Sequence, residues 1–425
     1  MKPPPVILSL PQAREQHTAL VQNMASAEGR RRTPYMAQER EGEVCDLTRP
    51  RNFPRKSPTL SGDRQGVLRR ALPLRGAAGL RMTALSLLFL LLMAVSASAQ
   101  VQEQITVERI LVDTRVTDDH GNPITGLKPA DFQVKVDGKP ATVESADWIP
   151  ETAAARELAD IDSNGAEVNT SLDQPAPKGR LLIFFYQTDF ARNSVRLIGQ
   201  MQQVVNANDW LDWLDPDDRV AVFSFDSHLK FRLDFTSNKG DIKNAMEQAL
   251  LTDEPQPPRI VPMPALSKRL DRNEMRKAAS PEAALIIVAN ALRPIPGPKS
   301  IILFGWGLGR LVGGGVIMEK KYPAARQALE SARASVFSID FTQADYHSLE
   351  VGLGQVAGDT GGFYAKTFNF PKIAVERLQK TLAGHYELEV RKPDTKVRGT
   401  HTIEVEVPSQ RNAAVLARST YVDRD

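Results

Sequence analysis

The sequence holds one cysteine, Cys45, among 425 residues. A single thiol cannot form an intramolecular disulfide, and structural zinc sites built on cysteine use two or more of them. Cys45 also lies in the leading segment, before the first predicted strand. A disulfide framework and a cysteine-ligated metal are therefore excluded for the rest of the chain.

The motifs that usually reveal catalysis are missing as well. The six histidines are scattered without H-E-x-x-H spacing, and the sequence contains neither G-x-S-x-G nor a P-loop. Residues 305–315 (GWGLGRLVGGG) follow a predicted strand, but the third glycine of G-x-G-x-x-G would fall on Arg310. This stretch predicts a loop at the edge of a sheet. We expect no catalytic residue, no cofactor-binding residue and no cofactor.

Excess positive charge is confined to the start of the chain. Residues 1–99 hold 15 Lys and Arg against 7 Asp and Glu, whereas residues 100–425 hold 39 against 44, a net charge of −5. Proteins that bind nucleic acid through a folded domain usually present a basic patch. We expect neither a nucleic acid nor an anionic membrane as the main partner of the folded part.

No apolar run reaches the ~20 residues that a membrane-spanning helix needs. The longest run, residues 85–95 (LSLLFLLLMAV), follows several arginines and precedes Ala97-x-Ala99, a small-residue pattern typical of signal-peptidase sites. The pattern predicts a signal peptide cleaved after Ala99, export to the periplasm or beyond, and no membrane span after cleavage. The alternatives are a buried helix and a membrane anchor. Residues 1–66 lack periodicity and predict either a mis-assigned start or a disordered extension.

Short, uninterrupted apolar runs dominate the middle of the chain. Runs of this kind predict strands buried on both faces, and each later run follows a segment with helical spacing. They predict an α/β fold with a mostly parallel, doubly wound, Rossmann-type sheet. The strands are expected at 180–186, 219–225, 300–304 and 335–339, and the helices at 194–210, 238–251, 281–292, 322–332 and 373–382.

The two ends of the chain predict strands of another kind, in which apolar and polar residues alternate. Either end alone is too short to bury a core of its own. We therefore predict that they pair into one β-sandwich, with the central domain inserted between them. The predicted parts are residues 1–99 (leader and signal peptide), 100–150 (N-terminal strands), 151–177 (linker), 178–383 (α/β domain) and 384–425 (C-terminal strands).

Five segments in order resemble the von Willebrand factor type A (VWA) domain, and most closely the secreted VWFA-related proteins of acidobacteria. They are LDPDDRVAVFSF at 214–225, DFTSNK at 234–239, VAGDTGGFY at 356–364, HYEL at 385–388 and ARSTY at 417–421. The resemblance covers roughly residues 101–422. It implies a VWA-like sheet and a role in protein–protein interaction or adhesion.

The family usually binds a divalent cation, in a metal-ion-dependent adhesion site, through a D-x-S-x-S loop, a Thr and a later Asp. In this sequence the first Asp falls on Gln187 or Asp189, and Ala191 occupies a serine position. Gly305 stands where the later Asp is usual, and only Ser280 matches the Thr. Hard cations need several oxygen ligands, so the resemblance implies a degenerate site without a bound metal.

These observations predict a secreted, non-enzymatic protein-binding module. Ligands of open α/β sheets usually bind at the carboxyl ends of the strands, so we expect metal-independent binding through the loops 187–193, 252–280 and 305–315. The alternatives are a structural component of the cell envelope and an envelope hydrolase with an unrecognised site. The partner is expected to be a protein, and the candidate contact residues are Asp189, Arg192, Trp306, Leu308 and Arg310.

Overall fold

The computed structural model describes residues 109–156, 179–188, 194–250, 254–255, 265–313, 315–342, 347–368, 371–393 and 398–423, with the side chains of 194–197 left out. All of them belong to one compact unit, Gln100–Asp425. The predicted leader, signal peptide and cleavage site lie outside the described residues, as do most of the linker and Asp189, Ala191 and Arg192. No helix in the described part of the chain is long and apolar enough to cross a membrane.

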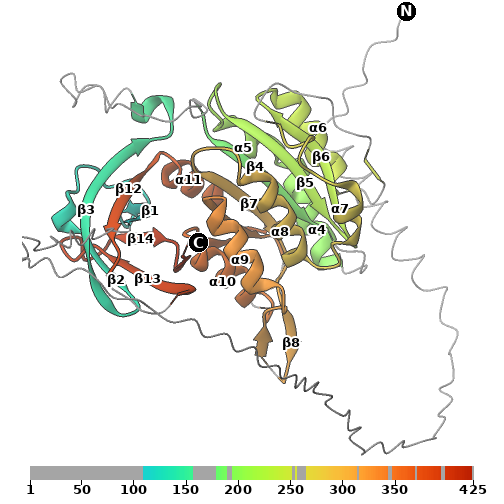
Figure 1. Cartoon of the computed structure of the whole chain (residues 1–425). Coiled ribbons are helices and arrows are strands. Elements are labelled where there is room, and N and C mark those ends of the chain that lie inside the picture. Colours follow the sequence, from blue (N-terminus) through green and yellow to red (C-terminus); the bar gives the residue numbers. More distant parts are fainter. Residues whose placement is uncertain are drawn as a thin grey trace, which may run out of the picture. The chain divides into compact units, whose positions relative to one another are not determined.

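A six-stranded sheet forms the centre of the α/β part, with strand order β11-β10-β7-β4-β5-β6 (Figure 1). Every neighbouring pair is parallel except β5 and β6, which are antiparallel. The four predicted apolar runs are confirmed as strands. The strands are β4 (Leu181–Gln187), β5 (Arg219–Phe225), β6 (Leu229–Thr236), β7 (Lys299–Gly305), β10 (Ala334–Asp340) and β11 (Tyr364–Lys366).

Helices cover both faces of this sheet, and β4 shows why its sequence is apolar throughout. Leu181, Ile183 and Phe185 belong to a core shared with α8, α9 and α10. The alternate residues Leu182, Phe184 and Tyr186 belong to a second core, shared with α5, α6 and α11. The helices are α4 (Ser194–Val205), α5 (Ala207–Asp212), α6 (Lys239–Ala249), α7 (Arg272–Lys277), α8 (Pro281–Leu292), α9 (Tyr322–Ser331), α10 (Glu350–Asp359) and α11 (Pro371–Thr381).

The helix ends follow local chemistry. α8 begins where predicted because Pro281 fits the first helical position and Ser280 Oγ accepts a hydrogen bond from Ala283 N at 3.2 Å. The single helix predicted at 194–210 is divided at Asn206 into α4 and α5. The loop expected at 252–280 contains α7 (Arg272–Lys277), which follows the capping residue Asp271.

The strands from the two ends of the chain are interleaved in one seven-stranded antiparallel sheet, with the order β14-β1-β12-β3-β2-β13-β15. β12 pairs with β1 on one side and with β3 on the other, so the C-terminal part completes the N-terminal part. The strands are β1 (Arg109–Thr117), β2 (Gln133–Val136), β3 (Lys139–Pro150), β12 (Gly384–Arg391), β13 (Thr400–Glu406), β14 (Ala414–Ala417) and β15 (Thr420–Val422), with a 3₁₀ turn at Pro129–Asp131.

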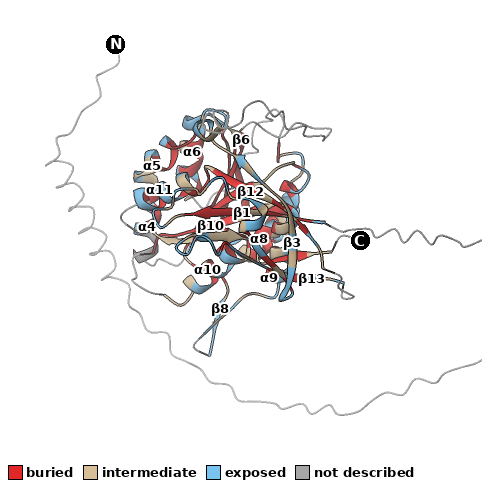
Figure 2. Ribbon diagram, turned by 90° about the vertical axis from the view of Figure 1, so that its left-hand side faces the viewer, coloured by how far each residue is buried: buried red, intermediate tan, exposed pale blue. Residues whose placement is uncertain are grey.

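This sheet encloses its own apolar core, in which Val112, Val136 and Leu388 are fully buried. Its edge strands β14 and β15 are separated in the chain by only Arg418 and Ser419. The sheet must therefore curve until its two edges approach each other. The predicted division into two stacked sheets stays unconfirmed, because the described strands form one continuous sheet. Figure 2 shows buried residues concentrated along the strands and exposed ones on the outer helix faces.

Candidate functional site

The rim of the six-stranded sheet lies at the carboxyl ends of its parallel strands. Asp340 pairs with Gly305 in register, and Tyr186 pairs with Phe304, so the last residues of β10, β7 and β4 line up across the sheet. Gln187, Gly305 and Asp340 therefore occupy neighbouring positions. This is the edge at which sequence and resemblance place the binding loops.

Gln187 holds the loop that follows β7 in place through three hydrogen bonds. Its Nε2 donates to Gly307 O at 2.8 Å, and its Oε1 accepts from Trp306 N at 3.1 Å and Gly307 N at 3.3 Å. A Cβ atom at Gly305 would lie 3.0 Å from the same Oε1. The amide of Gln187 thus fills the space into which an acid at position 305 would have to extend.

Two further positions of the implied ion site, 280 and 305, supply no free ligand atom. Ser280 Oγ caps α8, and Gly305 has no side chain. The described residues contain two groups of acids and histidines whose ligand atoms converge, and neither includes Gln187, Ser280 or Gly305: Asp113, His385 and Glu387 at the junction of the sheets, and Asp340, His347 and Glu350 at the end of β10. The described residues at the position that the resemblance implies therefore do not fit a divalent cation.

A pocket of about 240 Å³ opens at the rim next to Gln187. It is smaller than the ~300–1000 Å³ clefts that hold drug-sized ligands. Its walls come from the ends of β4, β5 and β7 and from the start of α8: Gln187, Thr188, Phe225, Asp226, Ala279, Ser280, Pro281, Glu282, Trp306, Gly307, Leu308, Gly309 and Glu319. Three rim segments that are far apart in the sequence thus meet in one cavity.

The candidate contact residues divide into two groups. Arg310 is exposed and lies 3.7 Å from Glu319, and Trp306 lines the rim pocket while packing partly against the second core. Leu308, in contrast, is only 2% exposed and belongs to the first core. Its side chain is not available to a partner, since the loop turns it back toward α10, where Gly352 approaches Leu308 O. Asp189 and Arg192 lie outside the described residues.

The loop after β7 contains a hairpin that the sequence did not predict. β8 (Arg310–Val312) pairs with β9 (Gly315–Ile317) in an antiparallel two-stranded sheet, which extends away from α9 and α10 (Figure 1). Leu311, Val312 and Ile317 are 58%, 43% and 49% exposed. Gly309 starts the hairpin with φ of +79°, and a Cβ there would approach Ile317 O to 2.8 Å, so only glycine fits.

At the end of β10, Asp340 is the centre of a hydrogen-bond network. One oxygen accepts from Thr342 N and Thr342 Oγ1, and the other lies 2.8 Å from both His347 Nε2 and Tyr364 OH. Lys366 Nζ is 2.9 Å from Glu350 Oε2. Burial opposes ionisation of Glu350, but the hydrogen bonds and charges of Lys366 and His347 together outweigh it and lower the pKa of that carboxyl. The lysine thus supplies the positive charge that a metal would bring.

A second group at the rim combines a hydroxyl, an imidazole and a carboxylate. In the turn after β5, Ser227 Oγ lies 3.0 Å from His228 Nδ1, and His228 Nε2 lies 2.6 Å from Glu254 Oε1. Sequence reasoning missed this group because Glu254 is 26 residues further on. Asp226 Oδ1 also lies 3.2 Å from Ser227 Oγ, and its negative charge would oppose an alkoxide there.

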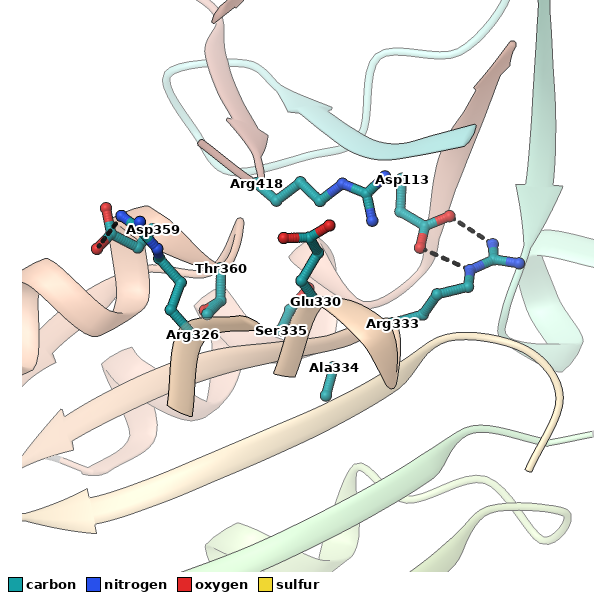
Figure 3. A pocket seen from close by; sticks show the side chains of 9 residues that line it. All are labelled: Asp113, Arg326, Glu330, Arg333, Ala334, Ser335, Asp359, Thr360 and Arg418. Atoms are coloured by element: carbon teal, nitrogen blue, oxygen red, sulfur yellow. Dashed lines mark hydrogen bonds and ion pairs between the residues drawn. The ribbon is translucent and has the colours of Figure 1, made fainter. Parts of the chain in front are cut away.

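The junction between the two sheets is shown in Figure 3. Arg333, just before β10, binds Asp113 of β1 with Nε at 3.0 Å and Glu387 of β12 at 2.6 Å. Burial raises the pKa of the Asp113 carboxyl, but hydrogen bonding and charge from Arg333 outweigh this and hold it below its usual value. The adjoining cavity of about 20 Å³ has room for about one water molecule. We therefore assign the junction a structural role.

The comparisons with known proteins come from structure alone. No protein-family model matches the sequence, and no curated protein matches it. The human COPII-coat protein Sec24c is similar at 13% identity and a TM-score of 0.32, over 59% of this chain and 44% of that protein. A von Willebrand factor type A protein from Catenulispora acidiphila is similar at 8% identity and a TM-score of 0.36, over 75% of each chain.

Proximal thread matrix protein 1 from the mussel byssus, solved with zinc in its MIDAS motif, is similar at 16% identity and a TM-score of 0.31. That likeness covers 51% of this chain and 48% of the mussel protein, so the chain spans about half the length of two of these three proteins. None of the TM-scores reaches 0.5. The description of the fold therefore rests on the strand order and the two cores given above.

Proposed function

We propose that this chain is a secreted, non-enzymatic, VWA-like interaction protein that binds a protein partner through the rim without a metal ion. The observation that carries the proposal is the β8–β9 hairpin. It presents three exposed apolar side chains, Leu311, Val312 and Ile317, beside the rim pocket and the exposed Arg310. Clustered apolar and arginine side chains on a protruding surface are typical of binding sites.

The proposal of metal-independent binding is supported by the chemistry of the rim. Gln187 and Ser280 are engaged in hydrogen bonds within the protein, and Gly305 offers no ligand. A divalent ion at the position that the resemblance implies, beside Gln187, Ser280 and Gly305, would lack the oxygen ligands it needs. Contact through side chains of the hairpin, Trp306 and Arg310 requires no ion.

The test is capture of a partner from cell-envelope extract by the full chain, with and without chelator. We expect the same protein in both captures. Replacing Leu311 and Ile317 by serine should reduce capture at least tenfold at an unchanged melting temperature. Replacing Trp306 and Arg310 by alanine should reduce capture as much, with a modest fall in the melting temperature because Trp306 packs partly against the second core. Val205→Ser is the matched control, because Val205 is 75% exposed at the far end of α4. Loss of capture on chelation would contradict metal-independent binding, and undiminished capture by both double variants would contradict the rim surface.

A second candidate is a hydrolase, and the Ser227–His228–Glu254 group is the observation that favours it. If Ser227 were a nucleophile, the full chain would hydrolyse an activated ester such as p-nitrophenyl acetate, and Ser227→Ala would abolish that activity. We expect no difference between the wild type and Ser227→Ala, because Asp226 lies beside the hydroxyl. A loss of 100-fold or more in the variant would favour the hydrolase.

A further inference from the structure

The rim pocket is acidic. Among its thirteen described lining residues, three are acids and none is a base. Two of the acids are paired with cations of the chain: Asp226 lies 2.5 Å from Lys230 Nζ, and Glu319 lies 3.7 Å from Arg310. The third acid, Glu282, has no such pairing within the described residues.

Glu282 is buried, with 1% of its surface exposed. Its Oε1 accepts a hydrogen bond from Gly309 N at 3.2 Å, while its Oε2 has no hydrogen-bond donor among the described residues. The N-terminal end of α8 favours the negative charge but does not supply a donor to Oε2. A buried carboxylate oxygen without a donor is costly, and a ligand that donates to it recovers that cost.

The shape and walls of the pocket favour an organic cation over a metal ion. Asp226, Glu282 and Glu319 do not form a convergent ligand group, since the two such groups in the described part of the chain consist of other residues. The cavity suits one side chain by volume, and Trp306 and Phe225 line it as well. Aromatic rings attract ammonium and guanidinium groups, and a carboxylate hydrogen bonds to either.

We propose that the rim pocket takes a lysine or arginine side chain of the partner protein, whose cation pairs with Glu282. This proposal rests on the proposed function and adds the chemistry of the partner's central residue. Because Glu282 is almost fully buried, the glycine-rich segment 307–309 must shift for the cation to reach Oε2. The hairpin that follows this segment would then contact the surface around the inserted side chain.

The test uses the full chain labelled with 5-fluorotryptophan, with the Trp306 fluorine resonance assigned by Trp306→Phe. The probes are the N-acetyl methylamides of lysine, arginine and norleucine, and magnesium chloride. We expect lysine and arginine probes to shift the Trp306 resonance saturably and the neutral norleucine probe to have no effect. Glu282→Gln should weaken the cationic probes at least tenfold, whereas Glu274→Gln in α7 should leave them unchanged.

Several outcomes would overturn the proposal: no shift with either cationic probe, an equal shift with norleucine, or unchanged affinity in Glu282→Gln. A magnesium-induced shift that Glu282→Gln abolishes, without binding of the organic cations, would assign the pocket to an inorganic ion. The norleucine comparison is made on the wild type, so it shows whether binding requires a cationic side chain even if Glu282→Gln fails to fold. If capture depends on the hairpin but persists in Glu282→Gln, the proposed function stands and this inference fails.

Discussion

At the residue scale, the buried pair of Arg180 and Asp218 shows what one of the acids in the turn before β5 does. Both side chains are almost fully buried, and Arg180 Nε lies 3.0 Å from one carboxylate oxygen. The other oxygen accepts from Asp215 N at 2.8 Å, which fixes the turn before β5. The guanidinium also lies 4.6 Å from the Trp213 ring. Asp218 is therefore a structural residue.

Asp218→Ala should destabilise the protein by about 3–5 kcal/mol, because it leaves the Arg180 charge buried without its partner. The neighbouring Asp217 provides the control. Its side chain is 59% exposed, so Asp217→Ala should change the free energy of unfolding by less than about 0.5 kcal/mol. Chemical denaturation of the two variants measures both values. Equal effects of the two substitutions would refute the assignment.

At the element scale, β15 is held to the edge of its sheet by a histidine. His401 of β13 is 1% exposed and stacks on Tyr421 of β15. Its Nδ1 lies 2.7 Å from Asp137 and its Nε2 lies 3.0 Å from Asp423. Burial lowers the pKa of His401, but the hydrogen bonds that its ring donates to both carboxylates, together with their negative charges, outweigh this and raise it above 6.5. A hydrogen bond from Lys392, with smaller help from His401, lowers the pKa of Asp423 to about 2.

The stabilisation from a raised histidine pKa is complete below pH 6.5 and is lost as the pH rises through the folded-state value. We therefore expect the melting temperature to fall above pH 6.5 more steeply in the wild type than in His401→Gln. The exposed His120 serves as control, and His120→Gln should keep the wild-type slope. The measurement is a thermal melt from pH 5 to 9. An identical slope in His401→Gln would show that this histidine does not titrate as expected.

Some strands of the six-stranded sheet can be predicted from the sequence and others cannot. β4, β5, β7 and β10 are predictable because burial on both faces leaves an uninterrupted apolar run. β6 is not predictable in this way because it contains Lys230, Arg232 and Asp234. These side chains are buried because they form ion pairs or hydrogen bonds with partners such as Asp226 and Ser224. The β8–β9 hairpin is exposed and its strands are three residues long, so no periodicity marks it.

The candidate site is only partly predictable for a related reason. Strand ends identify the rim; Trp306 lines the rim pocket and Arg310 begins β8, while their contact with a partner stays a prediction. The clamp of Gln187 on Gly307 joins residues 120 positions apart, and no local pattern signals it. The hydrogen bond that Glu282 accepts comes from Gly309, which lies in another loop. Leu308 looked like a contact residue, but tertiary packing places its side chain in the core.

At the scale of the whole molecule, Arg333 joins the seven-stranded sheet to the α/β part. Arg333→Met should destabilise the protein by about 2–5 kcal/mol, because Asp113 and Glu387 lose their shared cation. We also expect the wild type to unfold in one calorimetric transition and Arg333→Met to unfold in two. Arg293→Met, at an exposed position after α8, is the control and should leave the transition unchanged. A single transition with the wild-type midpoint in Arg333→Met would exclude this coupling.

The pH dependence of this junction has the opposite sign to that of His401. Because the pKa of Asp113 is lowered on folding, its contribution is present above pH 3.8 and is lost as the pH falls through the folded-state value. The wild type should therefore lose stability in that acidic range more steeply than Arg333→Met. Denaturation between pH 5 and 2 compares the two slopes.

The interleaving of strands from both chain ends sets an order of events during synthesis. β3 lacks its neighbour β12 until residue 391 has been made, and β1, which pairs with both β12 and β14, lacks one until residue 417. During synthesis, the edges of β1 and β3 that later pair with β12 keep unpaired backbone N–H and C=O groups while the α/β part is made. A prematurely terminated chain would keep these unpaired edges permanently and become a target for chaperones or proteases.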